Sequence, residues 1–159
     1  LNANANWILN VVGLTESAYL ALYPEHAELL SDLSDRVIFH GRRSHIESLE
    51  MLKSADFSVL LRDATRANLA GFPTKYVESV SCGTPVISNS VGSLTAEMIA
   101  SDRGVVVDDP SAAALAESLL VLLGPSVPST VAGSATASRR FDYRSWIQPF
   151  QKFMEGVAK

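Results

Sequence analysis

The sequence predicts an α/β fold in which about five short strands form a single parallel, doubly wound sheet. Helices are expected on both faces of this sheet, and further helices follow as a C-terminal tail. One observation behind this prediction is the regular alternation of continuously apolar runs with segments of helical periodicity, which is typical of parallel strands buried on both sides. The other is composition. The 159 residues are 47% hydrophobic and 19% charged, which excludes a disordered chain and predicts one domain with its own core.

The individual elements follow in order from these patterns. Apolar runs place the strands at residues 7–14, 36–41, 57–61, 85–88 and 104–107. Helical periodicity places helices at residues 16–33, from 44 onward, and at 73–81, 93–101, 109–123, 130–139 and 143–157. Pro24 interrupts the first helical pattern, so a break or kink is expected there. Ser44 followed by Glu47 makes a capping-box pattern, and Pro73 is the expected first residue of its helix.

Charge and cysteine content narrow the class of protein. The net charge of −4 disfavours broad nucleic-acid binding, because that function needs a basic face. The single cysteine, Cys82, excludes an internal disulfide and favours a reducing compartment. No apolar run approaches the ~18 residues that a membrane helix needs. Because the sequence opens with Leu1 rather than Met, we expect one domain of a longer protein.

The carboxyl ends of the predicted strands are where a ligand is expected, because doubly wound folds bind their ligands at this edge. The connections that leave this edge are residues 13–15, 41–44, 62–74, 89–93 and 108–110. Residues 62–71 are polar and are expected to form the longest loop in the middle of the chain.

The helix that begins at Pro73 has the strongest ligand signal. A helix N-terminus offers unpaired N–H groups and a partial positive charge, which suit a phosphate. Gly71 allows close approach and Thr74 adds a hydroxyl, while Lys75 adds a cation that costs ~0.3–1 kcal/mol at this end unless an anion is bound. Glu78 lies one turn further on the same face, where a carboxylate suits a ribose. The alternative is an exposed i,i+3 ion pair between Lys75 and Glu78.

Basic side chains at two other strand ends extend this candidate site. Arg62 follows the third strand directly, and Arg66 and Asn68 lie in the expected loop; guanidinium groups bind phosphate in bidentate fashion. The same edge has a glycine and two arginines after the second strand, namely Gly41, Arg42 and Arg43. A glycine there lets a base or sugar lie against the backbone. The alternatives are a solvated loop at the first place and a tight turn before the helix cap at the second.

No metal or cofactor is expected. The histidines, His26, His40 and His45, are too scattered along the chain for a metal site, and structural roles are predicted for them. Cys82 has no obvious histidine partner, so core packing is predicted for it. Walker, paired-histidine and nucleophile-elbow motifs do not occur in the sequence, and Gly13 alone does not make a dinucleotide fingerprint.

Residues 71–94 (GFPTKYVESVSCGTPVISNSVGSL) resemble the donor-binding domain of the family 4 glycosyltransferases, the group 1 glycosyltransferases of GT-B fold. Members of that family have a Pro-Thr-Lys-aromatic helix with a Glu, then a Gly-x-Pro-Val-Ile strand and a loop that contains glycine. The upstream runs WILNVVGL and RVIFHGRRSHIESLEMLKSADFSVLL and the downstream run RGVVVDDPSAAALAESLLVLL are also similar to the family. The resemblance therefore extends from the first predicted strand to the end of the helix that follows the fifth.

The resemblance implies that the whole chain is a single Rossmann-like domain, the C-terminal half of a glycosyltransferase. Such a domain binds a nucleotide-diphosphate sugar, with no further cofactor. It implies that Glu78 binds the ribose, that Thr74 and Lys75 lie at the diphosphate, and that residues 41–43 lie near the nucleobase. The sugar would pass to a glycan or lipid-linked acceptor on a preceding domain. The implied process is polysaccharide synthesis in the cytoplasm or at the inner face of the membrane.

Two departures from the family pattern affect the predicted site. Many members have a Glu for the donor sugar eight residues before the ribose-binding Glu, and this sequence has Ala70 there. Members also bind the diphosphate through an Arg and a Lys of an opening strand–helix unit, which has no counterpart in the 159 residues. We therefore predict that Lys75 and Arg62 supply the catalytic charge, with Arg66 beside them. The chain alone is expected to bind nucleotide weakly and to transfer nothing.

Two other functions stay open at this point. A nucleotide-sugar 2-epimerase shares the two-domain architecture, so it would show the same motifs. A flavodoxin-like interaction module without catalysis fits the fold class equally well. A receiver domain is disfavoured, because no acidic pair follows the first predicted strand.

Overall fold

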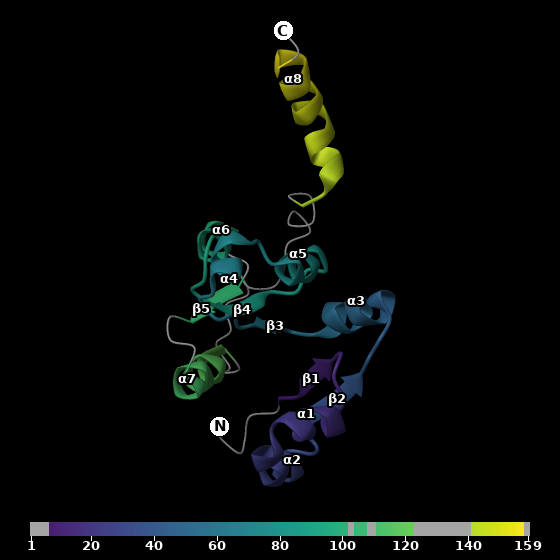
Figure 1. The fold of residues 1–159 in the computed structure, drawn as a ribbon, viewed down its shortest axis with the longest axis vertical. Coiled ribbons are helices and arrows are strands. Elements are labelled where there is room, and N and C mark those ends of the chain that lie inside the picture. The colour runs from purple at the N-terminus through teal and green to yellow at the C-terminus, as the bar shows by residue number, and fades with distance from the viewer. Residues whose placement is uncertain (1–6, 102–103, 108–110, 123–140, 158–159) are drawn as a thin grey trace.

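The computed structural model of the protein describes residues 7–101, 104–107, 111–122 and 141–157. Helices and strands alternate along most of this chain, as the sequence predicts (Figure 1). In chain order the elements are β1 (Leu9–Val12), α1 (Glu16–Leu22), η1 (Pro24–His26), α2 (Ala27–Asp32), β2 (Val37–Gly41), α3 (His45–Ser54), β3 (Ser58–Leu60), α4 (Arg66–Ala70), α5 (Thr74–Ser81), β4 (Val86–Asn89), α6 (Leu94–Ser101), β5 (Gly104–Val107), α7 (Ala112–Leu122), η4 (Tyr143–Trp146) and α8 (Ile147–Val157).

All five predicted strands are present and every pairing is parallel, but the strands form two sheets where the sequence predicted one. β1 pairs with β2, and β3, β4 and β5 pair in that order. In the described residues β1 and β3 are therefore edge strands, and Leu9 and Val59 stay 44% and 45% exposed. Apolar runs identify strands but do not specify neighbours, because pairing depends on how the connections carry the chain through space.

The main core lies on the two faces of β4, the central strand of the larger sheet. On one face Val86 packs with the α5 and α6 side chains Tyr76, Val80, Leu94 and Met98. On the other face Ile87 and Val107 pack with side chains of α7. Helices therefore cover both faces of this sheet (Figure 1), which is why all four residues of its central strand are buried.

Several local signals in the sequence act as predicted. Pro24 ends the helical run after α1 and begins the 3-10 turn η1, as expected for a residue without a backbone N–H. Ser44 caps α3, and Glu47 completes the capping box by accepting from the Ser44 amide at 2.8 Å. Gly83 has a φ of 85°, a conformation that favours glycine, and it follows the C-cap of α5.

Two predictions around the candidate site need correction. Residues 62–71 are not entirely a loop, because α4 forms within them; Thr65 caps this helix by accepting a hydrogen bond from the Asn68 amide at 3.3 Å. Pro73 is the N-cap of α5 and not its first helical residue, because its ψ of 119° is extended. The change at Pro73 leaves the first amides of α5 without a side-chain acceptor at the cap.

The C-terminal part described by the structure is the predicted helical tail. It begins as a 3-10 turn, η4, and continues as α8, which extends away from both sheets (Figure 1). One stripe of α8 exposes its apolar side chains, among them Phe150, Phe153 and Val157. The predicted turn at 124–129 and helix at 130–139 lie outside the described residues.

Candidate functional site

The N-terminus of α5 lies at the ligand edge of the larger sheet and is open to solvent. α5 follows the carboxyl end of β3 by way of α4 and leads into β4, so its first turn faces the edge where ligands of this fold class bind. Thr74 and Lys75 are exposed, while Pro73 is buried beneath them. The helix tip therefore presents its amides, one hydroxyl and one ammonium group to a ligand.

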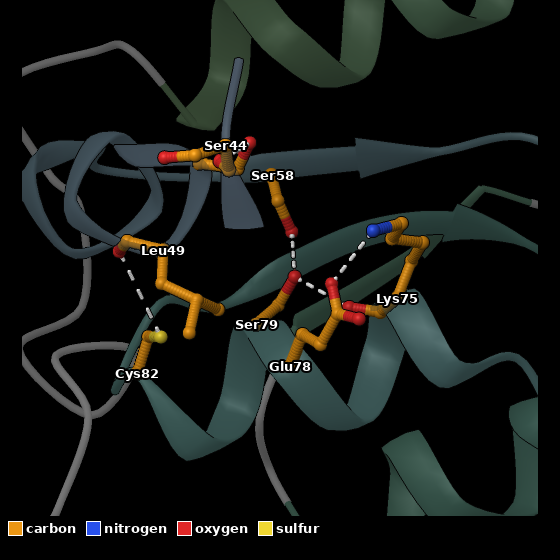
Figure 2. Close-up of polar contacts among 8 residues, drawn as sticks. Ser44, Leu49, Ser58, Lys75, Glu78, Ser79 and Cys82 are labelled. Carbon is orange, nitrogen blue, oxygen red and sulfur yellow. Dashed lines mark hydrogen bonds and ion pairs between the residues drawn. The ribbon is translucent and has the colours of Figure 1, made fainter. Parts of the chain in front are cut away.

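Lys75 and Glu78 contact each other on this exposed face of α5 (Figure 2). Lys75 Nζ lies 2.8 Å from Glu78 Oε2, and the two side chains are 69% and 27% exposed. The ion pair that the spacing allowed is thus formed. An exposed pair of this kind contributes only ~0–1 kcal/mol, so phosphate and ribose oxygens can replace it at little cost.

A serine relay ties the first turn of α5 to the sheet. Ser58 of β3 donates to Ser79 at 2.9 Å, and Ser79 donates to the Lys75 carbonyl at 2.8 Å (Figure 2). Because Ser79 is buried, this contact anchors the backbone of the first turn to the sheet. Among the described residues, the exposed Lys75 side chain is held only by its ion pair with Glu78.

Arg62, just beyond the end of β3, contacts Asn89, the last residue of β4. The Arg62 amide donates to Asn89 Oδ1 at 2.8 Å, and Asn89 Nδ2 donates to the Arg62 carbonyl at 2.8 Å. The Arg62 side chain donates from Nη2 to Asn68 Oδ1 at 2.6 Å. The structure thus brings Arg62 and Asn68 together as neighbours at the sheet edge, beside the helix that the site requires.

The other predicted residues on this side of the site have more limited roles in the structure. Arg66 is exposed in the first turn of α4. Gly71 is the C-cap of α4, and a Cβ there would lie 3.1 Å from the Ala67 carbonyl oxygen. Gly71 therefore lets the backbone after α4 pass close to the Ala67 carbonyl, so that the close approach predicted at this glycine is between two parts of the chain.

The predicted nucleobase segment belongs to the smaller sheet. Gly41 ends β2 with a φ of 64°, is buried, and exchanges backbone hydrogen bonds with the turn after β1. Arg42 and Arg43 are exposed in the turn before α3. Hydrogen bonds from the Ser44 side chain and amide, together with the charge of Arg43, hold the pKa of Glu47 below its usual range. In the described residues, no hydrogen bond or ion pair links residues 41–43 to the Arg62 or Lys75 groups.

Two of the three histidines and the cysteine have structural contacts, while His45 is exposed at the start of α3. His26 Nδ1 lies 2.8 Å from the Tyr19 hydroxyl, and His40 Nε2 lies 2.7 Å from Asn10 Oδ1. Cys82 is half-buried, with its Sγ 3.9 Å from the Leu49 carbonyl oxygen (Figure 2). Across the parts of the chain that the structure describes, no three His, Cys, Asp or Glu side chains are grouped as in a metal site.

Sequence reasoning did not single out Asn89, Thr65 or Gly92. Asn89 is 6% exposed at the end of β4. Its position, a polar residue at the carboxyl end of a predicted strand, is the feature of the sequence that could have identified it. Gly92 has a φ of 64°, and a Cβ there would lie 3.0 Å from the Leu69 carbonyl oxygen, so the loop after β4 packs on α4. These residues shape the site from a neighbouring connection.

No helix among the described residues is long and apolar enough to cross a membrane.

Comparison with solved structures shows the same fold. The chain superimposes on sucrose-phosphate synthase from Thermosynechococcus elongatus with a TM-score of 0.64 and 24% identity, over 94% of this chain and 38% of that one. It superimposes on Anabaena HepE, solved in complex with UDP, with a TM-score of 0.67 and 20% identity, over 94% and 41%. For WaaG, a glycosyltransferase involved in lipopolysaccharide biosynthesis, the TM-score is 0.63 with 21% identity, over 87% and 35%. The chain therefore spans well under half the length of each of these proteins.

Sequence comparison assigns the family. No curated protein matches the chain significantly. The model of the family described as glycosyl transferases group 1 matches residues 1–125, which include the tip of α5 and every strand of both sheets. The resemblance seen in residues 71–94 is thus confirmed, and the chain belongs to the group 1 glycosyl transferases.

Proposed function

We propose that this chain is the donor-binding domain of a glycosyltransferase and that it holds a nucleotide-diphosphate sugar at the tip of α5. The observation that carries the proposal is the open, cationic helix N-terminus at the carboxyl edge of a doubly wound sheet. Family membership supports sugar transfer over the epimerase and the interaction module that the sequence left open. The structural likeness to HepE, which was solved with UDP and with UDP-glucose, supports a donor of this class.

Each polar group of the site then has a role toward the donor. The first amides of α5, the Thr74 hydroxyl and Lys75 receive the diphosphate, while Glu78 accepts hydrogen bonds from the ribose. When the donor binds, the Lys75–Glu78 pair breaks. Lys75 then has the diphosphate as its partner and Glu78 has the ribose hydroxyls, so neither group is left without a hydrogen-bond partner. Lys75 and Arg62, with Arg66 beside them, stabilise the negative charge that develops on the leaving diphosphate. Residues 41–43 take the nucleobase.

The charge that leaving-group stabilisation needs can come from this chain itself. We propose that transfer requires neither a metal nor a further cofactor, because helix amides, an ammonium group and guanidinium groups stand at the same edge. This role for amides and basic side chains is the one the family resemblance implies.

Further units complete the enzyme in this proposal. An acceptor-binding domain holds a glycan or lipid-linked acceptor, and an opening strand–helix unit completes the donor domain. The absence of pairing between β1 and β3 supports the opening strand–helix unit, because in doubly wound sheets of order 3-2-1-4-5-6 the first strand lies between the second and the fourth. The acceptor-binding domain is supported by the 38% and 41% of the solved structures' length that this chain covers. The proposed place of action, for polysaccharide synthesis, is the cytoplasm or the inner face of a membrane, and the unpaired Cys82 supports a reducing compartment.

Ligand-dependent thermal stability tests this function. The chain is melted alone and with UDP, GDP, ADP, UMP or uridine at matched ionic strength, with sulfate as the control anion. A donor-binding domain is expected to gain stability from at least one nucleoside diphosphate, well above the gain from the matching monophosphate. Equal shifts for diphosphate, monophosphate and sulfate, or none at all, would reject the proposal.

A further inference from the structure

The contact between Asn89 and Arg62 continues the sheet by means of a side chain. Backbone pairing of β3 with β4 ends at Leu60 and Ser88. Beyond this last backbone pair, the side-chain amide of Asn89 links the two segments, because it offers both an acceptor and a donor, as a peptide group does. It accepts from the Arg62 amide and donates to the Arg62 carbonyl, both at 2.8 Å. Few other side chains can make both bonds.

The same contact fixes where the Arg62 side chain begins. Asn89 is 6% exposed, so water does not compete for its two hydrogen bonds. With its backbone held, Arg62 reaches Asn68 through Nη2 at 2.6 Å. Asn68 is itself held by the Thr65 cap and by its bond to the Asp63 carbonyl at 2.8 Å. Arg62 is thus restrained at its backbone by the sheet and at its guanidinium by α4.

This restrained guanidinium lacks a counter-charge. Among the described residues its one side-chain partner is the neutral Asn68, and the ion pairs in that part of the chain are made by other residues. Its Nη1 is covered from solvent and has no acceptor among the described residues. A partly buried cation with an unmet donor costs stability unless an anion supplies both the charge and the acceptor. An anionic oxygen of the ligand has the required chemistry, and it reaches Nη1 when the groups that cover this atom shift on binding.

We propose that Asn89 is a positioning residue, which holds Arg62 so that its guanidinium meets a diphosphate oxygen of the donor. This inference rests on the proposed function and adds the last residue of β4 to the site. Asn89 does not touch the donor in this arrangement. It acts through Arg62, with Asn68 as the second restraint on the same side chain.

A double-mutant cycle tests this role. UDP and uridine affinities are measured by calorimetry for the wild-type chain, Asn89→Ala, Arg62→Gln and the double variant. Asn89→Ala is expected to weaken UDP binding about tenfold, because a misplaced guanidinium loses its charge-assisted bond. Uridine binding should change less than about twofold, which a general loss of structure would not achieve. In the Arg62→Gln background, Asn89→Ala should have almost no further effect on UDP.

The outcomes separate this inference from the function on which it rests. Where the melting experiment selects GDP or ADP, that diphosphate and its nucleoside replace UDP and uridine in the cycle. If the wild-type chain distinguishes none of the three diphosphates from its nucleoside, the proposed function fails and the role of Asn89 fails with it. If the wild type binds UDP selectively but Asn89→Ala leaves that selectivity intact, only the role of Asn89 is wrong. Equal losses in both Arg62 backgrounds would also reject it. Should Asn89→Ala not fold by circular dichroism, Asn68→Ala is the deciding variant. It removes the contact to the Arg62 side chain and the bond to the Asp63 carbonyl but leaves the Arg62 backbone held by Asn89, and it should weaken UDP binding about threefold.

Discussion

Lys75 Nζ lies 2.8 Å from Glu78 Oε2, so the two charged groups that the sequence marks at the tip of α5 are bound to each other. This contact is the ion pair that the i,i+3 spacing of the motif allows. An exposed i,i+3 pair is weak, and the lysine stands where the partial positive charge of the helix disfavours it. In the proposed function a diphosphate binds Lys75 and a ribose binds Glu78 in place of this pair.

Lys75→Ala should separate diphosphate binding from nucleoside binding. Loss of the ammonium group removes a charge-assisted bond of ~1.5–3 kcal/mol to the diphosphate, so UDP affinity should fall about tenfold or more. Uridine has no phosphate, and its affinity should stay within about twofold. Calorimetric titration of both ligands measures this difference. Lys152→Ala, at an exposed position on the distant α8, is the matched control and should change neither. Equal losses for the two ligands would contradict the phosphate role of Lys75.

Glu78→Gln should weaken UDP and uridine alike. The ribose is common to both ligands, and a neutral amide accepts a hydrogen bond less strongly than a carboxylate does. We expect a loss of about tenfold for each ligand, measured in the same titrations. Glu155→Gln on α8 removes an exposed carboxylate far from the site and serves as the control. A loss confined to UDP would mean that Glu78 acts through Lys75 and not on the ribose.

Gly92→Ala should destabilise the fold next to the site. At a φ of 64° an alanine is strained by ~1–2 kcal/mol, and its Cβ would press on the Leu69 carbonyl oxygen at 3.0 Å. The free energy of unfolding should therefore fall by about 2 kcal/mol in urea titrations. Gly156→Ala is the control, because a Cβ in that α8 position meets nothing within 4 Å and alanine is the better helix former. An equal change in the free energy of unfolding for the two substitutions would contradict the contact between the loop after β4 and α4.

The capping box of α3 should make stability depend on pH. The pKa of Glu47 is lowered in the folded chain by the Ser44 side chain and amide, with a contribution from Arg43. A lowered folded pKa means that the carboxylate stabilises the fold above its unfolded pKa and loses this effect as pH falls through the folded value. Relative to wild type, Glu47→Gln should be less stable at pH 7, and the difference should shrink toward about pH 3. Urea unfolding at several pH values measures it.

A control for this pH effect comes from the same helix. Glu50→Gln removes one exposed carboxylate of α3 outside the capping box, so it is the matched control for the loss of one negative charge from this helix. A constant difference between wild type and Glu47→Gln across the range would show that the cap does not titrate with folding.

Much of the fold could be predicted because its signals are local. The β5 strand has the predicted bounds, 104–107, and the capping box of Ser44 and Glu47 forms as expected. The break at Pro24 is also present. Each of these depends on residues a few positions apart, whose interactions are the same in any tertiary setting. The sequence does not predict α4, because this short helix and its cap, Thr65, lie in a polar stretch that lacks the apolar periodicity of a helix.

The amino-acid sequence determined the strands, the caps and the charged helix tip, together with the family to which they belong. Tertiary structure alone decided that β1 and β3 do not pair and that Asn89 holds Arg62, residues that lie 27 positions apart. The physical reason is the range of the interactions involved. Periodicity and capping act within one or two turns, whereas strand neighbours and side-chain bridges between loops depend on where whole connections place the backbone.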